Sequence, residues 1–211
     1  MAAPKRKDLL ILALLVLAAC AVQRWLAGTR PIGTELRGNP TVAALLADTR
    51  APRRDVAEPT LTLVVFTDYR CPACKLAAPA MDSAVARDGH VRVIYRDWPI
   101  FGPPSVHAAR VAIAAARQGI YPTLHSRLMA EGRPLNDEVL REAVERSGGD
   151  WGRVERDLAL VGRAIDARLA DTASAAGGLG IPGTPAYLIG SVLVVGALDE
   201  AGFADAFRRG R

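Results

Sequence analysis

The chain has 211 residues, of which half are apolar and 23% are charged, and its formal net charge is +5. This length suits one domain with an additional segment, and the composition is sufficient for a packed core. The basic residues are scattered and do not form a stripe interleaved with aromatic residues, so we expect no nucleic-acid partner. Three cysteines are too few for a scaffold built on disulfides or for a four-cysteine zinc site.

The N-terminus has the pattern of a membrane-targeting segment. Basic residues at positions 5–7 precede an uncharged apolar run from Leu9 to Val22. Basic residues before such a run hold the N-terminus in the cytoplasm and direct the following chain across the membrane. We therefore expect residues 1–27 to be a signal or anchor segment that forms a membrane-targeting helix, with the rest of the chain in the periplasm of a bacterium.

Three fates of this segment remain open. Leu17-Ala18-Ala19-Cys20 is similar to the lipobox of bacterial lipoproteins, which makes Cys20 a candidate lipidation site. The small residues on both sides of Cys20 also fit a signal-peptidase site. Extended to Ala27, the run approaches the ~20 residues of an uncleaved spanning helix. Each fate places the following chain in an oxidising compartment, where disulfides persist.

Residues 28–59 contain several prolines and predict a tether with one short helix, over about 41–47, which Asn39 and Pro40 begin. The folded domain is expected from residue 60 onward. The apolar run Leu61 to Phe66 predicts a buried strand, and the alternating residues 91–96 predict a second one. Since a helix lies between them, the two strands are expected to be parallel.

Residues 105–176 predict a helical block. Apolar spacing indicates helices over 106–116 and 121–131. Asn136 and Asp150 are residue types that cap helix N-termini, so we expect one helix to begin after each, and a further helix over 165–175.

The end of the chain returns to strands. Residues 186–189 and 192–195 predict a hairpin, and Asp199 begins a final helix that reaches about residue 209. The predicted fold class is therefore α/β, with the order βαβ, a helical insertion, and ββα.

Cys71-Pro72-Ala73-Cys74 lies where the first predicted strand turns into its helix. Unpaired N–H groups and the positive end of the helix dipole stabilise a thiolate at this position. A disulfide between residues so close in the chain is strained, and strained exposed disulfides tend to be labile or catalytic. We therefore assign Cys71, as the more exposed thiol, to the attack on or by a client sulfur, and Cys74 to resolving the mixed disulfide. No metal is expected, because the histidines lack ligand spacing to this pair; they are His90, His107 and His125.

The stretch Phe66 to Lys75, F-T-D-Y-R-C-P-A-C-K, resembles the F-x-D-Y-x-C-P-x-C-K sequence of DsbA-like thiol–disulfide oxidoreductases in the thioredoxin superfamily. Pro79 matches the proline of the superfamily's active-site helix, and Gly183-Thr184-Pro185 is similar to the family's loop before a strand. Residues 96–102, R-D-W-P-I-F-G, also resemble the family. The resemblance covers about residues 60–209.

This resemblance implies a thioredoxin-like domain over residues 60–211, with a helical insertion at about 105–176. It implies a redox-active disulfide between Cys71 and Cys74 and no other cofactor. It also implies a cis bond before Pro185, which turns the backbone of Thr184 toward an extended client. The expected partners are client proteins with cysteines and a membrane or periplasmic redox partner.

Pro72, Ala73 and Lys75 are the residues expected to tune the redox chemistry. The strongest oxidases of the family carry His at the position of Ala73, and Ala has no donor for the thiolate, so we expect a less oxidising protein. Many relatives place an acid at the position of Val65, which leaves water or Asp68 to accept the proton of Cys74.

Oxidation of clients is the expected function. Disulfide isomerase or reductase activity remains the alternative within the family. Outside the family, the alternative is a copper-binding chaperone, with Met81 as the nearest additional ligand. The large aromatic residues outside the motif are expected to pack in the core or between domains and not to form a client-binding patch; they are Trp98, Phe101 and Trp151.

Overall fold

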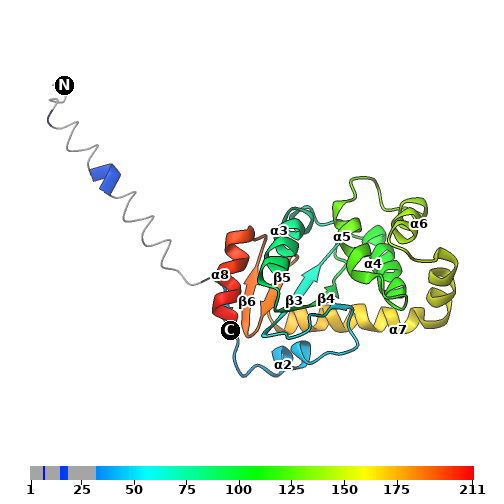
Figure 1. Cartoon of the computed structure of the whole chain (residues 1–211), viewed down its shortest axis with the longest axis horizontal. Helices are drawn as coiled ribbons and strands as arrows, with labels where there is room; N and C mark the ends of the chain where they lie inside the picture. Colours follow the sequence, from blue (N-terminus) through cyan, green and yellow to red (C-terminus); the bar gives the residue numbers. More distant parts are fainter. Residues whose placement is uncertain (1–6, 8–14, 19–31) are drawn as a thin grey trace. The chain divides into compact units, whose positions relative to one another are not determined.

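The computed structural model describes Lys7, residues 15–18 and residues 32–211 (Figure 1). Residues Gly33–Arg211 form one compact unit. The predicted membrane-targeting segment lies largely outside the described residues, and Cys20 lies wholly outside them. Among the helices of the described part, none is both long enough and apolar enough to cross a membrane.

A six-stranded sheet forms the centre of the domain. Its order, from one edge to the other, is β1 (Thr34–Glu35), β6 (Val192–Val195), β5 (Ala186–Ile189), β3 (Leu61–Thr67), β4 (Val91–Asp97) and β2 (Arg53–Arg54). The two central strands β3 and β4 are parallel, and α3 (Pro72–Asp88) connects them. The hairpin β5–β6 adds to β3 in the antiparallel direction. This is the thioredoxin-like arrangement, so the predicted fold class is confirmed.

Residues 33–59 belong to the folded unit, although the sequence predicts a tether there. They supply both edge strands, β1 and β2, and the helix α2 (Pro40–Leu46). Asn39 caps α2 by accepting a hydrogen bond from the backbone N–H of Thr41 at 2.8 Å. Val42 and Leu45 are buried against the sheet. The two edge strands have only two residues each, too few for an alternating pattern to reveal them.

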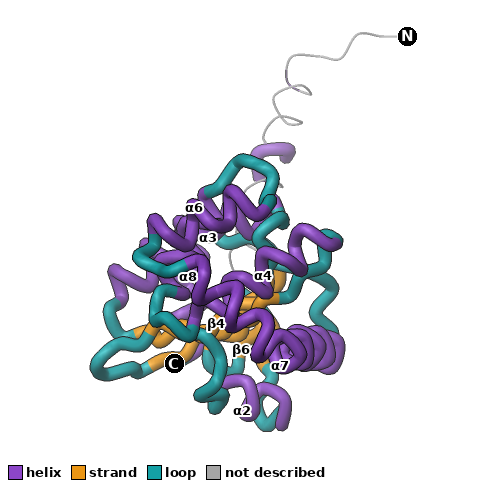
Figure 2. Tube along the Cα trace, turned by 90° about the vertical axis from the view of Figure 1, so that its right-hand side faces the viewer, coloured by secondary structure: helices purple, strands orange, loops and turns teal. Residues whose placement is uncertain are grey.

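Helices cover both faces of the sheet. Figures 1 and 2 show α3 and α8 (Glu200–Gly210) on one face, and α2 and the end of α7 (Trp151–Gly178) on the other. Side chains alternate along a strand, so Val64 and Phe66 pack into the core beneath α2 and α7. Val65 points to the opposite face, which α3 and α8 cover.

The helical insertion consists of α4 (Pro103–Ala116), α5 (Tyr121–Ala130), α6 (Asp137–Arg146) and α7. Asn136 and Asp150 cap α6 and α7 as the sequence predicts. However, α7 is a single helix of 28 residues, and the separate helix predicted over 165–175 is wrong. Gly162 lies within this helix, where an added side chain would meet only the flexible end of Arg110 on α4. Helices α4 and α7 pack against each other, and this tertiary contact supports the continuous helix.

Candidate active site

Cys71 is the N-cap residue of α3, with φ −72° and ψ 117°. Its sulfur accepts a hydrogen bond from the backbone N–H of Cys74 at 3.4 Å. Its S–H group donates to the carbonyl oxygen of Thr184 at 3.2 Å. A helix N-terminus therefore faces the sulfur from one side, and the 183–185 loop covers it from the other, an arrangement suited to stabilising a thiolate.

Both thiols are free and buried, with 2% of Cys71 and 3% of Cys74 exposed to solvent. The expectation that Cys71 is the more exposed thiol is therefore wrong, because the loop at Thr184 covers it. Burial raises the pKa of Cys74 to about 12. Cys74 is thus held as a neutral thiol, which makes it a poor nucleophile until the environment of the pair changes.

The loop at 183–185 has the conformation that the resemblance implies. The peptide bond between Thr184 and Pro185 is cis. The carbonyl oxygen of Pro185 accepts a hydrogen bond from Gly196 at 2.9 Å, which ties the loop to the end of β6. The chain continues directly into β5, the neighbour of β3, so one sheet holds both the cysteine turn and this loop in place.

Asp68 is a buried anchor of the turn. Its carboxylate accepts four hydrogen bonds, of 2.6–3.0 Å, from the backbone N–H groups of Arg70, Ile100 and Phe101 and from the hydroxyl of Ser105. These bonds join the cysteine turn to the segment 98–105. With both oxygens occupied in this way, Asp68 is better placed to position the turn than to accept a proton from Cys74.

Two basic residues close to Cys71 in the chain, Arg70 and Lys75, are engaged elsewhere. Lys75 donates to the carbonyl oxygen of Glu131, and burial lowers the pKa of Lys75. Arg70 donates to the carbonyl oxygen of Phe101 at 2.8 Å. In the described structure neither side chain hydrogen-bonds to the sulfur of Cys71, so the nearest positive potential comes from the N-terminus of α3. Pro72 is the first residue of that helix, a position that needs no N–H donor.

Tyr187 on β5 is a site residue that the sequence analysis missed. It pairs across the sheet with Val65, so both side chains point to the face covered by α3 and α8. Its ring lies edge-on to Phe203, with ring centroids 4.9 Å apart. Burial raises the pKa of Tyr187, and the charged forms of Cys74 and Cys71 raise it further, so the ring lies within electrostatic range of both sulfurs. Among the described residues its hydroxyl has no hydrogen-bond partner.

A buried polar cluster lies behind the turn and was also missed. The hydroxyl of Tyr69 bonds to the hydroxyl of Tyr121 at 3.1 Å and to Nδ1 of His125 at 3.2 Å. Tyr121 donates to Asp97 at 2.8 Å. Burial raises the pKa of Asp97 to about 7 and lowers that of His125 to about 3. Because Tyr69 is two residues before Cys71, this cluster fixes the turn to β4 and α5.

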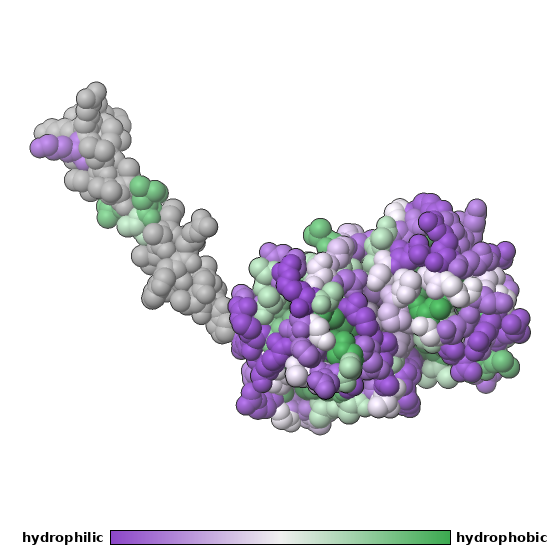
Figure 3. Space-filling model, viewed as in Figure 1, coloured by the Kyte–Doolittle hydropathy of each residue, from purple (hydrophilic) through white to green (hydrophobic). Residues whose placement is uncertain are grey.

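Exposed apolar side chains surround the cysteine turn. They are Leu76 on α3, Ile100 and Phe101 in the segment that Asp68 holds, and Val106 on α4. Phe101 is 42% exposed, so its predicted place in the core is wrong, whereas Trp151 is buried as expected. The side chain of Ile100 approaches Gly183. Figure 3 shows apolar areas of this kind as separate patches on a largely hydrophilic surface.

The described part of the chain contains no cluster of three or more histidine, cysteine or acidic side chains that could hold a metal ion. Met81, the additional copper ligand considered from the sequence, is 1% exposed and packs in the core on α3.

Comparison with known proteins agrees with the geometry. Residues 62–208 match the family described as DSBA-like thioredoxin domain. The chain belongs to this family. Its fold is that of the DsbA-like thiol–disulfide oxidoreductases, and the family resemblance inferred from the sequence is confirmed.

Two solved structures are similar over most of their length. A thioredoxin-like oxidoreductase from Silicibacter pomeroyi DSS-3 is 33% identical, with a TM-score of 0.75 over 82% of this chain and 98% of the other. A periplasmic thioredoxin-like protein from Salmonella enterica serovar Typhimurium is 30% identical, with a TM-score of 0.68 over 82% of this chain and 96% of the other.

A curated relative is much longer than this DsbA-like chain. The Na(+)/H(+) antiporter NhaA 3 of Salinispora tropica is 32% identical over 142 residues, which make up 66% of this chain and 21% of the antiporter. The chain therefore spans about a fifth of that protein.

Proposed function

We propose that this DsbA-like protein introduces disulfides into client proteins outside the cytoplasm, with Cys71 as the sulfur that reacts with the client. The observation that carries the proposal is the position of Cys71, between the N-terminus of α3 and the cis Thr184–Pro185 loop. The helix stabilises the thiolate, and the loop offers a backbone edge to an extended chain.

The reaction consists of two successive thiol–disulfide exchanges. A client thiolate attacks the sulfur of Cys71 in the Cys71–Cys74 disulfide, which forms a mixed disulfide and releases the sulfur of Cys74, which takes up a proton. A second client thiolate then attacks the client sulfur of the mixed disulfide and releases Cys71 as a thiolate. The client is oxidised by two electrons and the protein is reduced by two. A membrane or periplasmic redox partner returns the pair to the disulfide.

Many relatives carry an acid at the position of Val65, and in this chain we propose that Tyr187 is the polar group that assists Cys74 instead. The sulfur of Cys74 leaves the disulfide in a buried place, where a thiolate is poorly solvated. The charges of Cys74 and Cys71 act on the hydroxyl of Tyr187, and we propose that this hydroxyl donates a hydrogen bond to the sulfur of Cys74 once charge develops there. Its raised pKa keeps this hydroxyl protonated.

Clients dock on the apolar residues around the turn. Phe101 and Ile100 are held by hydrogen bonds from their backbone to Asp68, so this surface keeps its shape. Leu76, which is 76% exposed, extends it along α3. Unfolded clients with exposed apolar residues are suited to such a surface.

The proposed location is the periplasmic side of a bacterial membrane, with residues 1–27 as a signal or anchor segment and Cys20 as a candidate lipidation site. Alkylation of Cys20 in membrane fractions, together with the mass of the mature N-terminus, distinguishes a lipid anchor from an uncleaved helix and from a cleaved signal.

The roles of the cysteines are tested by trapping. With a client thiol, Cys74→Ser is expected to accumulate a mixed disulfide at Cys71 that non-reducing electrophoresis detects, whereas Cys71→Ser is not. Equal trapping by both variants would reject the assignment. The direction is tested with ribonuclease: an oxidase restores activity to the reduced enzyme faster than to the scrambled one, and the opposite order indicates an isomerase.

A further inference from the structure

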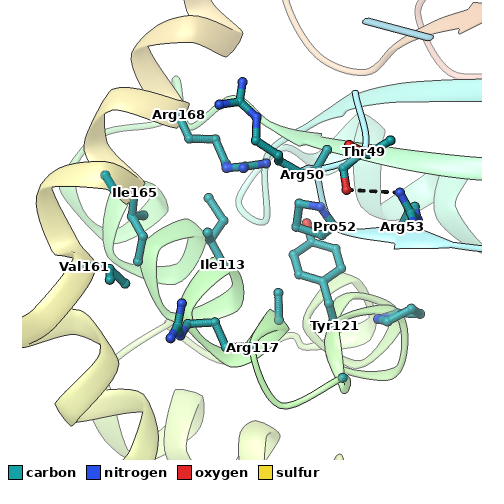
Figure 4. Close-up of a pocket in the computed structure, with 15 residues that line it drawn as sticks. Thr49, Arg50, Pro52, Arg53, Ile113, Arg117, Tyr121, Val161, Ile165 and Arg168 are labelled. Carbon is teal, nitrogen blue, oxygen red and sulfur yellow. Dashed lines mark hydrogen bonds between the residues drawn. The ribbon is translucent and has the colours of Figure 1, made fainter. Parts of the chain in front are cut away.

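A pocket with a cavity volume of about 520 Å³ lies between the helical insertion and the segment before β2. Figure 4 shows its apolar wall, in which Ile113 of α4 and Ile165 of α7 face the ring of Tyr121. Neither Cys71 nor Cys74 lines it, and the Thr184–Pro185 loop does not line it either. Its volume is within the range of pockets that bind small molecules, about 300–1,000 Å³.

The rim of this pocket carries four arginines and no acidic residue; they are Arg50, Arg53, Arg117 and Arg168. Two of them are neutralised from outside the pocket, since Arg53 pairs with Asp55 at 2.6 Å and Arg117 with Asp157 at 3.1 Å. The excess positive charge therefore lies at Arg50 and Arg168.

Arg168 forms no ion pair with a carboxylate among the described residues, although its charge acts on Asp48 and Asp97. Its Nη1 atom is buried, and no described residue accepts a hydrogen bond from it. The nearby Asp48 is already bound by Arg96 at 2.8 Å, and it lies 3.9 Å from Arg50. Asp48 thus faces three guanidinium groups, since the charge of Arg168 also helps to lower the pKa of Asp48. The same charge counteracts the rise in the pKa of the buried Asp97, which forms no ion pair with Arg168.

A buried donor without an acceptor is unfavourable, and a guanidinium group is suited to binding two oxygens of a carboxylate or phosphate. We propose that this pocket binds a small amphipathic anion, whose carboxylate or phosphate head contacts Arg168 and Arg50 and whose apolar body packs against Ile113 and Ile165. The proposal does not depend on disulfide exchange, because no step of that chemistry involves the pocket.

Fluorine NMR titration of the full chain tests the proposal with three probes of similar size. They are 4-fluorophenyl phosphate, 4-fluorophenylacetate and the neutral 4-fluorophenylacetamide. We expect both anions, or one of them, to bind at least tenfold more tightly than the amide. The stronger of the two anions identifies the head group that the pocket accepts.

Arg168→Gln is expected to weaken binding of the preferred anion at least fivefold. The matched control is Arg163→Gln, an exposed residue of α7 that does not line the pocket, and it is expected to leave binding unchanged. If Arg168→Gln does not fold, as judged by circular dichroism, Arg50→Gln replaces it; this side chain is 83% exposed, and we expect at least threefold weaker binding.

Three results would overturn the proposal. They are no binding of either anion at millimolar concentration, equal binding of the amide, and equal losses from Arg163→Gln and from the pocket variant. None of them bears on whether Cys71 and Cys74 exchange disulfides.

Discussion

The thiol of Cys71 donates a hydrogen bond to the carbonyl oxygen of Thr184 at 3.2 Å, across 113 positions of the chain. This carbonyl belongs to the loop that is proposed to pair with an extended client. The disulfide form of Cys71 has no S–H group to donate, so oxidation releases the carbonyl for a client N–H.

We therefore predict that the disulfide form binds an unreactive client peptide, with Ser in place of Cys, about fivefold more tightly than the dithiol form. Isothermal titration calorimetry of the two forms measures this ratio. Cys71→Ser keeps a donor and is expected to bind like the dithiol, whereas Cys71→Ala is expected to bind like the disulfide. Equal affinities for these two variants would contradict the explanation.

Ala73→His is predicted to make the protein more oxidising. A donor at this position stabilises the thiolate of Cys71 and therefore the reduced form, which raises the reduction potential by about 30–60 mV. Equilibration with glutathione buffers measures the potential. Ala73→Leu, which adds bulk without a donor, is the control and is expected to change the potential by less than about 10 mV. A lower potential for the His variant would show that this position does not act through hydrogen bonding.

Tyr187→Phe is predicted to slow reduction of the Cys71–Cys74 disulfide by reduced glutathione about fivefold, because the sulfur of Cys74 loses its donor. Stopped-flow fluorescence measures the rate. Tyr95→Phe is the matched control, since Tyr95 pairs with the same Val65 from the other side. Charges at Arg54 and Asp82, and not the cysteines, influence the hydroxyl of Tyr95. An equal effect of both changes would indicate a packing defect and not a role for the hydroxyl.

Asp97→Asn is predicted to change the pH dependence of stability. Burial raises the pKa of Asp97 from 3.8 to about 7, so between these values the folded protein holds a proton that the unfolded chain has released. Stability contributed by Asp97 is therefore present at low pH and is lost as the pH rises through about 7. Asn is uncharged at every pH, so the variant does not lose this stability as the pH rises. Relative to wild type, the variant's free energy of unfolding is expected to increase between pH 5 and 8 by up to about 3 kcal/mol.

Urea unfolding at several pH values measures that difference. The pKa of His125 is lowered to about 3, so its own contribution changes in the opposite direction below about pH 6.5. Taking the difference between wild type and variant removes this contribution. Asp205→Asn, on the surface of α8, is the control, and a constant offset at every pH for Asp97→Asn would contradict the prediction.

The sequence predicted the central strands and the cysteine turn because their signals are local. β3 is an apolar run, β4 alternates between apolar and polar residues, and the motif from Phe66 to Lys75 is continuous. The edge strands β1 and β2 were not predicted, because two residues carry no periodicity and pairing with β6 and β4 alone defines them. The separate helix predicted over 165–175 was wrong, because the packing of α4 against α7, which supports one continuous helix, is not visible in the sequence.

The missed site residues have a different physical cause. Tyr187 lies in an apolar strand, and nothing local distinguishes a hydroxyl near two sulfurs from an ordinary core tyrosine. The cluster of Tyr69, Asp97 and Tyr121 joins three elements that are far apart in the chain. The exposure of Cys71 depends on a loop more than 110 positions away. Each of these features is a tertiary contact, which composition and spacing do not encode.

Tyr121 contributes to two structures at once. Its ring forms part of the wall of the arginine-lined pocket, and its hydroxyl belongs to the buried cluster that ends at Tyr69, beside the cysteine turn. If anion binding and the redox state of the cysteines are coupled through Tyr121, this coupling is reciprocal. An anion that binds the dithiol form tenfold more tightly than the disulfide form raises the reduction potential by about 30 mV, and reduction strengthens anion binding by the same factor. The shift in anion affinity and the shift in reduction potential then measure the same coupling free energy.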